Sequence, residues 1–221
     1  MGRILALGIL GALASAQVAL AQSGSITGTI TTAVTGQAPV RVTIDQKVCG
    51  SELPDEAIVV DARGRLANAV VTVAGLKRAG GRESMVMNEK CRFAPRVQVA
   101  RPNGSVRTSS KDPVLHTTQA QYEDGRTIFN VGLPVPGITI TKAVGRAATV
   151  RLHCNTHPWM RGWLVVTDEA AAVSGADGRF TIDNVPPGTY QLRIWHEALK
   201  SASQTITVVA GQHTDVKFEL R

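Results

Sequence analysis

Short β-forming runs recur along most of the chain and constrain its fold more than any other feature. From residue 24 to residue 221, runs rich in Val, Ile and Thr alternate with turn-forming Gly, Pro, Asn and Asp. Such spacing is typical of β-sandwiches, and no stretch after residue 22 shows the 3.6-residue apolar period of an amphipathic helix. The sequence therefore predicts an all-β fold, and its 221 residues suffice for one large domain or two small ones.

The first 21 residues form a different kind of segment. One Arg is followed by a short apolar run and then by Ala19-Leu20-Ala21, which has the form of a cleavage site. We interpret residues 1–21 as a signal peptide cleaved after Ala21, so the mature protein is expected to be periplasmic or secreted. A membrane anchor is disfavoured because the run is short and diluted by Gly, Ala, Ser and Gln, so no stable membrane insertion is expected.

The charge of the chain bears on its partners. The formal net charge is +7, and the Lys and Arg residues are scattered along the sequence rather than gathered on a helix. No aromatic stacking motif accompanies them. This pattern disfavours nucleic acid as a partner and favours a solvated basic surface that attracts acidic proteins.

The chain has three cysteines, an odd number for an exported protein. Two cysteines of such a protein usually pair, and the third then needs an explanation. Cys49 and Cys91 both stand at the ends of strand-like stretches, VTIDQKVCG and MVMNEKCRF. We predict that these two form a disulfide, which leaves Cys154 as the free thiol.

The stretch HCNTHPWM carries the candidate metal ligands. Because side chains alternate along a strand, the preceding run turns Cys154 toward the core and His153 outward. His157 and Met160 follow on the adjoining loop, and only one histidine lies upstream of this stretch. A thiolate, two imidazoles and a thioether are the ligands of a blue-copper centre. The predicted ligands of one mononuclear copper ion are His116, Cys154, His157 and Met160.

Other chemistries fit these residues less well. A structural zinc site favours more cysteines and a closed tetrahedron without methionine. Nucleophilic catalysis by Cys154 and His157 is disfavoured because the two residues are too close in sequence for a papain-like arrangement, and Met160 has no part in it. We therefore do not expect an enzyme.

A pair of turns marks the C-terminal third of the chain. Asp177-Gly178 precedes one strand-like run, and Pro186-Pro187-Gly188 precedes the next. The stretch SGADGRFTIDNVPPGTYQLRIWHE resembles the carboxypeptidase regulatory-like domain, a prealbumin-like β-sandwich with a DGxFxI…PxGxY hallmark. SITGTITTAV and LANAVVTVAGL resemble the first two strands of that domain. The resemblance implies one such sandwich built from residues 24–80 and 168–221, and separate N- and C-terminal modules are the alternative.

The stretch CNTHPWMRGWLVV resembles the C-x2-H-x2-M copper loop of amicyanin, a cupredoxin. The likeness implies a cupredoxin Greek-key sandwich over residues 81–167, with Met160 as a weak axial ligand. It also implies that His157 lies nearest the surface and acts as the electron port. An apolar docking patch is expected around it, made of Pro158, Trp159, Leu133 and Pro134.

The whole mature chain resembles a family of exported bacterial proteins, labelled methylamine utilisation proteins, that combine both kinds of domain. The chain departs from that family at Arg96 and Gln119, where members carry His. The resemblance implies a type 1 copper protein that transfers one electron to or from a redox partner, such as a cytochrome or a dehydrogenase with an acidic contact surface. Two alternatives stay open: copper(I) binding and handling without redox turnover, and a structural or binding β-sandwich with a degenerate metal site.

Overall fold

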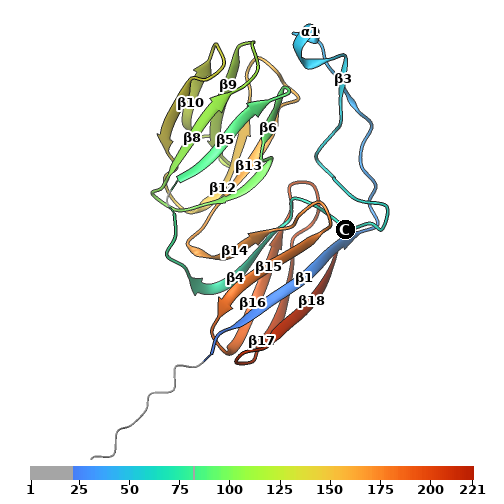
Figure 1. Ribbon diagram of the computed structural model, residues 1–221, viewed down its shortest axis with the longest axis vertical. Helices are drawn as coiled ribbons and strands as arrows, with labels where there is room; N and C mark the ends of the chain where they lie inside the picture. Colours follow the sequence, from blue (N-terminus) through green and yellow to red (C-terminus); the bar gives the residue numbers. More distant parts are fainter. Residues whose placement is uncertain (1–21, 82) are drawn as a thin grey trace, which may run out of the picture.

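The computed structural model describes residues 22–81 and 83–221, and the regular secondary structure of these residues is almost entirely β-strand (Figure 1). The strands build two β-sandwiches, an upper and a lower one in Figure 1, and the predicted all-β fold is confirmed. The proposed signal peptide, residues 1–21, lies outside the described residues. Among the residues that are described, none belongs to a helix with the length and apolar character needed to cross a membrane.

The lower sandwich takes its strands from both ends of the described chain. Its first sheet has the order β15 (Arg179–Val185), β1 (Gly24–Thr32), β18 (His213–Leu220). Its second sheet has the order β14 (Glu169–Val173), β4 (Val70–Lys77), β16 (Gly188–Trp195), β17 (Ala202–Val208). Alternate residues of both sheets meet in one apolar core that includes Ile26, Ile30, Val71, Val73, Phe180, Leu192, Val216 and Phe218. Each buried side chain of this size contributes about 1.5–3 kcal/mol, so the core holds together strands that are distant in sequence.

The upper sandwich is formed by strands that lie between β4 and β14 in the sequence. Its five-stranded sheet has the order β10 (Thr127–Leu133), β9 (His116–Tyr122), β12 (Ala148–His153), β13 (Arg161–Val166), β7 (Val97–Ala100). Its four-stranded sheet has the order β11 (Thr139–Ala143), β8 (Ser105–Ser110), β5 (Glu83–Glu89), β6 (Arg92–Ala94). The two sheets enclose a second core that includes Val86, Phe93, Val106, Val131, Val150, Leu152 and Leu164.

The connection between β1 and β4 leaves the lower sandwich and reaches the upper one (Figure 1). It carries β2 (Val40–Arg41), the short helix α1 (Gln46–Cys49) and β3 (Glu52–Leu53). Val42 and Cys49 are buried in the upper core, and Leu53 packs against that core. The assignment of all of residues 24–80 to the lower sandwich is therefore wrong for this segment. The segment belongs with the upper sandwich because these apolar side chains pack in its core and because a disulfide joins Cys49 to Cys91.

A buried ion pair joins the two sandwiches. Arg96 lies between β6 and β7, and its Nε and Nη2 donate to the carboxylate of Glu197, just beyond β16, over 2.6 and 2.8 Å. The two side chains are only 10% and 6% exposed. Beside them, Trp163 of β13 meets Trp195 of β16 edge to face, with ring centroids 5.5 Å apart. The junction thus combines a buried charge pair with an aromatic contact.

Candidate metal centre

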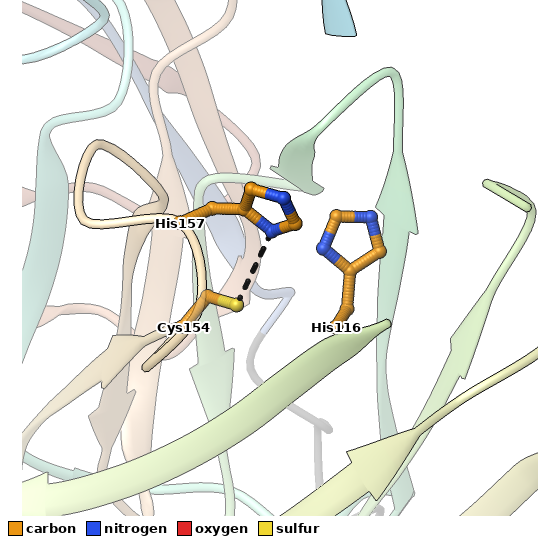
Figure 2. Close-up of side chains that lie close together, drawn as sticks. All are labelled: His116, Cys154 and His157. Atoms are coloured by element: carbon orange, nitrogen blue, oxygen red, sulfur yellow. Dashed lines mark hydrogen bonds between the residues drawn. The ribbon is translucent and has the colours of Figure 1, made fainter. Parts of the chain in front are cut away.

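Three potential ligands converge at one end of the upper sandwich. His116 begins β9, Cys154 directly follows β12, and His157 lies on the loop before β13. One donor atom from each of the three lies within 4.8 Å of those of the other two. Figure 2 shows both imidazoles beside the thiol, with the Cys154 Sγ 3.6 Å from the His157 Nδ1. Both histidines are 0% exposed and Cys154 is 3% exposed, so the group is closed to bulk water.

The alternation of the flanking strands explains why these side chains point inward. Along β12, Val150 and Leu152 are buried in the core, and Cys154 continues the same face. His116 takes the inward position at the start of β9, followed by buried Thr118. The orientation predicted for Cys154 thus agrees with the structure.

The loop between β12 and β13 holds Met160 next to Cys154. The Met160 N–H donates to the His157 carbonyl over 2.9 Å, and the Cys154 N–H donates to the Met160 carbonyl over 3.3 Å. Met160 is buried in the same apolar core as Cys154. The loop therefore brings the thioether residue to the edge of the group formed by the thiol and the two imidazoles.

Each imidazole contacts a carboxylate with the ring nitrogen that faces away from the thiol. His116 Nε2 lies 3.0 Å from the Asp112 Oδ2, and His157 Nε2 lies 3.0 Å from the Asp45 Oδ2. A carboxylate only accepts hydrogen bonds, so the proton of each neutral ring is on Nε2 and each Nδ1 keeps a lone pair. His116 Nδ1 is buried and has no hydrogen-bond partner in the described part of the chain.

This donor set fits copper on chemical grounds. A soft thiolate and a thioether suit copper(I), and imidazole nitrogens suit both copper(I) and copper(II). A buried nitrogen lone pair without a partner normally costs free energy, and a metal ion at this position would satisfy it. The carboxylates of Asp112 and Asp45 are the outer partners that commonly orient histidine ligands.

Hydrogen bonds favour the ionised form of Cys154. Burial raises the pKa of this thiol, but the contacts of the sulfur with the His116 ring, with the Thr117 N–H and hydroxyl and with the His157 backbone N–H outweigh burial and lower the pKa to about 6, from an ordinary value of 9.0. The Thr117 N–H, for example, donates to the sulfur over 3.3 Å. The thiolate that a metal ligand must supply is therefore favoured at neutral pH in the folded chain.

We expect a titration of the metal-free protein to show this shift directly. The ultraviolet absorbance of the Cys154 thiolate should rise with a midpoint near pH 6, well below the ordinary 9.0. Because folding lowers this pKa, the thiolate stabilises the folded state fully above pH 9.0, and this contribution is lost as the pH falls through about 6. Cys154→Ser should remove both the absorbance change and this part of the pH dependence of unfolding. A midpoint near the ordinary value would contradict the hydrogen-bonded arrangement.

The structure corrects two expectations about the surface. His157 does not lie at the surface as the cupredoxin likeness implied, because its ring is 0% exposed. The rings of His116 and Trp159 pack against it, and Asp45 contacts its Nε2. Leu133 does not belong to a docking patch, because it is 0% exposed and points into the core at the end of β10. Pro158 and Pro134 are exposed, and Trp159 is half-buried, with its indole N–H donating to the Cys91 carbonyl over 3.2 Å.

The remaining histidines lie away from the centre. His153 points to the opposite face of its sheet and is half-buried, as the alternation predicted. His196 lies just beyond β16 and His213 begins β18, both in the lower sandwich. Sequence reasoning missed Asp112 and Asp45. Asp112 could have been found from its position four residues before His116, whereas nothing local links Asp45 to a histidine 112 residues away.

Comparisons with known proteins concern parts of the chain. A family model described as "Carboxypeptidase regulatory-like domain" matches residues 125–221, which include β10 to β13 of the upper sandwich as well as the C-terminal strands. No curated protein matches the chain. The chain is similar to a purple cupredoxin from Nitrosopumilus maritimus, at 18% identity and a TM-score of 0.34, over 38% of this chain and 99% of that one.

Two further solved structures show the same limited likeness. A reduced copper(I) form of an amicyanin mutant is 16% identical with a TM-score of 0.34, over 44% of this chain and 98% of that one. A copper-containing nitrite reductase from Thermus scotoductus SA-01 is 18% identical with a TM-score of 0.33, over 42% of this chain and 24% of that one. Each of these three likenesses covers less than half of this chain.

Proposed function

We propose that this chain is an exported type 1 copper protein that transfers single electrons between redox partners and is not itself an enzyme. The observation that carries the proposal is the buried group of His116, Cys154 and His157, whose donor atoms lie within 4.8 Å of one another. Met160, on the same loop as His157, is the proposed axial ligand. When bound, copper supplies one-electron chemistry between its copper(I) and copper(II) states.

The protein's part is to hold its ligands in one arrangement. His116 begins β9 and Cys154 directly follows β12. These two strands pair with each other, so the sheet sets the separation of the two residues. The carboxylates of Asp112 and Asp45 fix the rotation of the two rings. A rigid, water-excluding shell keeps the ligands in place in both oxidation states, which lowers the reorganisation that electron transfer requires.

The proposed docking surface differs from the one first expected. Leu115 and Val135 are 47% and 52% exposed, and they stand next to the metal end because Leu115 precedes His116 and Leu133 pairs with His116. We propose that Leu115, Val135 and Pro158 contribute to a docking surface of the small size that transient redox complexes use. The basic chain would steer a partner with an acidic contact surface, such as a cytochrome or a dehydrogenase.

Copper(I) handling is the second candidate. The observation that favours it is the complete burial of His157, because a covered ligand slows electron exchange with a partner and protects copper(I) from solvent. In this case the chain would bind copper(I) and release it to another protein without redox turnover.

Copper titration with ligand variants tests the proposal. We expect the wild type to bind one copper(I) ion in competition with a chromogenic chelator, and His116→Ala to lose affinity by more than about 100-fold, the upper range for outer-shell changes. His153→Ala is the matched control, since His153 faces away, and it should bind as the wild type does. A reversible one-electron wave in protein voltammetry would support electron transfer, and its absence in a copper-loaded protein would favour copper handling. Equal affinities of the three proteins would contradict the ligand set.

A further inference from the structure

The burial of His157 has an identifiable cause. Pro158, the next residue on the loop, is exposed, yet the His157 ring is 0% exposed. The rings of His116 and Trp159 pack against it, with centroids 4.6 and 5.1 Å away. Its Nε2 edge contacts Asp45, which belongs to the segment 42–50 and whose carboxylate lies 3.0 Å from the His157 Nε2. This segment comes from the connection between β1 and β4, far from the metal loop in the sequence (Figure 1).

The segment 42–50 is anchored at both of its ends. Val42 is fully buried, and its N–H donates to the Ser51 carbonyl over 2.9 Å. The Gln46 Nε2 donates to the Val42 carbonyl over 2.7 Å. At the other end Cys49 forms the disulfide with Cys91. Asp45 itself adopts a left-handed conformation, with φ of 54°, which directs the chain into the turn of α1.

The disulfide also connects the segment to the surroundings of His116. The Cys91 N–H donates over 2.8 Å to the Asp112 Oδ2, the oxygen that lies 3.0 Å from the His116 Nε2. The Cys91 Sγ, which is bonded in the disulfide, lies within 4.8 Å of a carboxylate oxygen of Asp112 and a ring nitrogen of His116. The disulfide thus links the segment that carries Asp45, the partner of His157, to Asp112, the partner of His116.

We propose that residues 42–50 form a cap that closes the metal centre over His157, with Asp45 as the residue that positions this ligand. The inference rests on the proposed function. The cap holds the His157 ring with Nδ1 turned inward and shields its outer edge from water, chelators and other metal acceptors. Copper can leave through this side of the centre only when the contact between Asp45 and His157 breaks. The cap therefore sets the rate of copper release and contributes to the geometry of the bound ion.

Copper release from variants of Asp45 tests the cap. Loss of an outer partner of a histidine ligand lowers metal affinity by about 10- to 100-fold. We expect this loss to appear in the release rate, so copper(I) should pass from Asp45→Ala to an excess of a bidentate chelator faster than from the wild type by about the same factor. Asp45→Asn keeps an oxygen acceptor and should recover most of the wild-type rate. Asp124→Ala, which removes an exposed carboxylate elsewhere in the upper sandwich, is the control and should release copper as the wild type does.

A second measurement separates positioning from a merely structural role. The electron paramagnetic resonance spectrum of the copper(II) form should change in Asp45→Ala and not in Asp124→Ala. In the wild type, the His157 Nε2 proton should be protected from exchange with water, which nuclear magnetic resonance can follow without any variant.

The outcomes separate the cap from the proposed function. If the wild type binds copper but Asp45→Ala releases it at the wild-type rate with an unchanged spectrum, the cap is overturned and the copper function stands. A freely exchanging His157 proton would also overturn the cap, even if Asp45→Ala failed to fold. If the wild type binds no copper, the proposed function fails, and this inference fails with it.

Discussion

Glu197→Ala is expected to lower the free energy of unfolding by about 3 kcal/mol, at the lower end of the range for breaking a buried ion pair. The change removes the carboxylate that accepts two hydrogen bonds from the Arg96 guanidinium and leaves this charge 10% exposed at the junction of the sandwiches. Arg96 keeps a longer contact with Glu56, at 3.8 Å, and this contact limits the loss. Denaturation in urea, followed by circular dichroism, measures the effect.

Glu219→Ala is the matched control for this prediction. Glu219 pairs with Arg221 at 3.5 Å, but their side chains are 54% and 83% exposed, so water screens the pair. Its loss should cost no more than about 1 kcal/mol. Equal effects of the two substitutions would show that the contact between Arg96 and Glu197 does not hold the sandwiches together.

Removing the disulfide by replacing Cys49 and Cys91 together with Ser is expected to cost about 4 kcal/mol. The two residues are 42 positions apart, and a cross-link across a loop of this size restricts the unfolded chain by about that amount. The loss should also free one end of the cap, so a copper-loaded double variant should release copper faster than the wild type. Guanidinium denaturation and the chelator assay measure these two effects separately.

Val48→Ser serves as the control for the disulfide variant. It changes a side chain of the same helix that is 37% exposed and leaves the disulfide intact. It should change the free energy of unfolding by no more than about 0.5 kcal/mol. A double cysteine variant as stable as this control would contradict a stabilising role for the disulfide.

Local patterns made part of the centre predictable. Period-two alternation along the strand before the HCNTHPWM stretch was enough to predict that Cys154 points inward and His153 outward, because one face of that strand packs against the core.

A turn of the lower sandwich was also predictable. Asp177-Gly178 predicted a tight turn, and Gly178 has a φ of 67° there. A Cβ at Gly178 would lie 2.7 Å from the Ile30 carbonyl oxygen, so this turn requires glycine.

The burial of His157 could not be predicted in the same way. It depends on the neighbouring rings of His116 and Trp159 and also on the path of residues 42–50, which leave one sandwich and pack on the other through Val42 and Cys49. The run VRVTI before Asp45 has the residues of an ordinary strand, and only two of its residues, Val40 and Arg41, pair as β2. No periodicity within such a segment specifies which core it joins, because both cores are apolar and accept the same residue types. The likeness to other copper loops then pointed to an exposed histidine, and tertiary packing reversed that expectation.

The most direct test of the proposed copper centre is the visible and electron paramagnetic resonance spectrum of the protein loaded with copper(II), recorded beside Cys154→Ser. We expect an intense thiolate-to-copper absorption band with narrow copper hyperfine splitting in the wild type, and loss of both in the variant, because only Cys154 offers a thiolate at this position. A wild-type protein that binds copper(II) without this band, or a variant that keeps it, would contradict a type 1 centre built on Cys154.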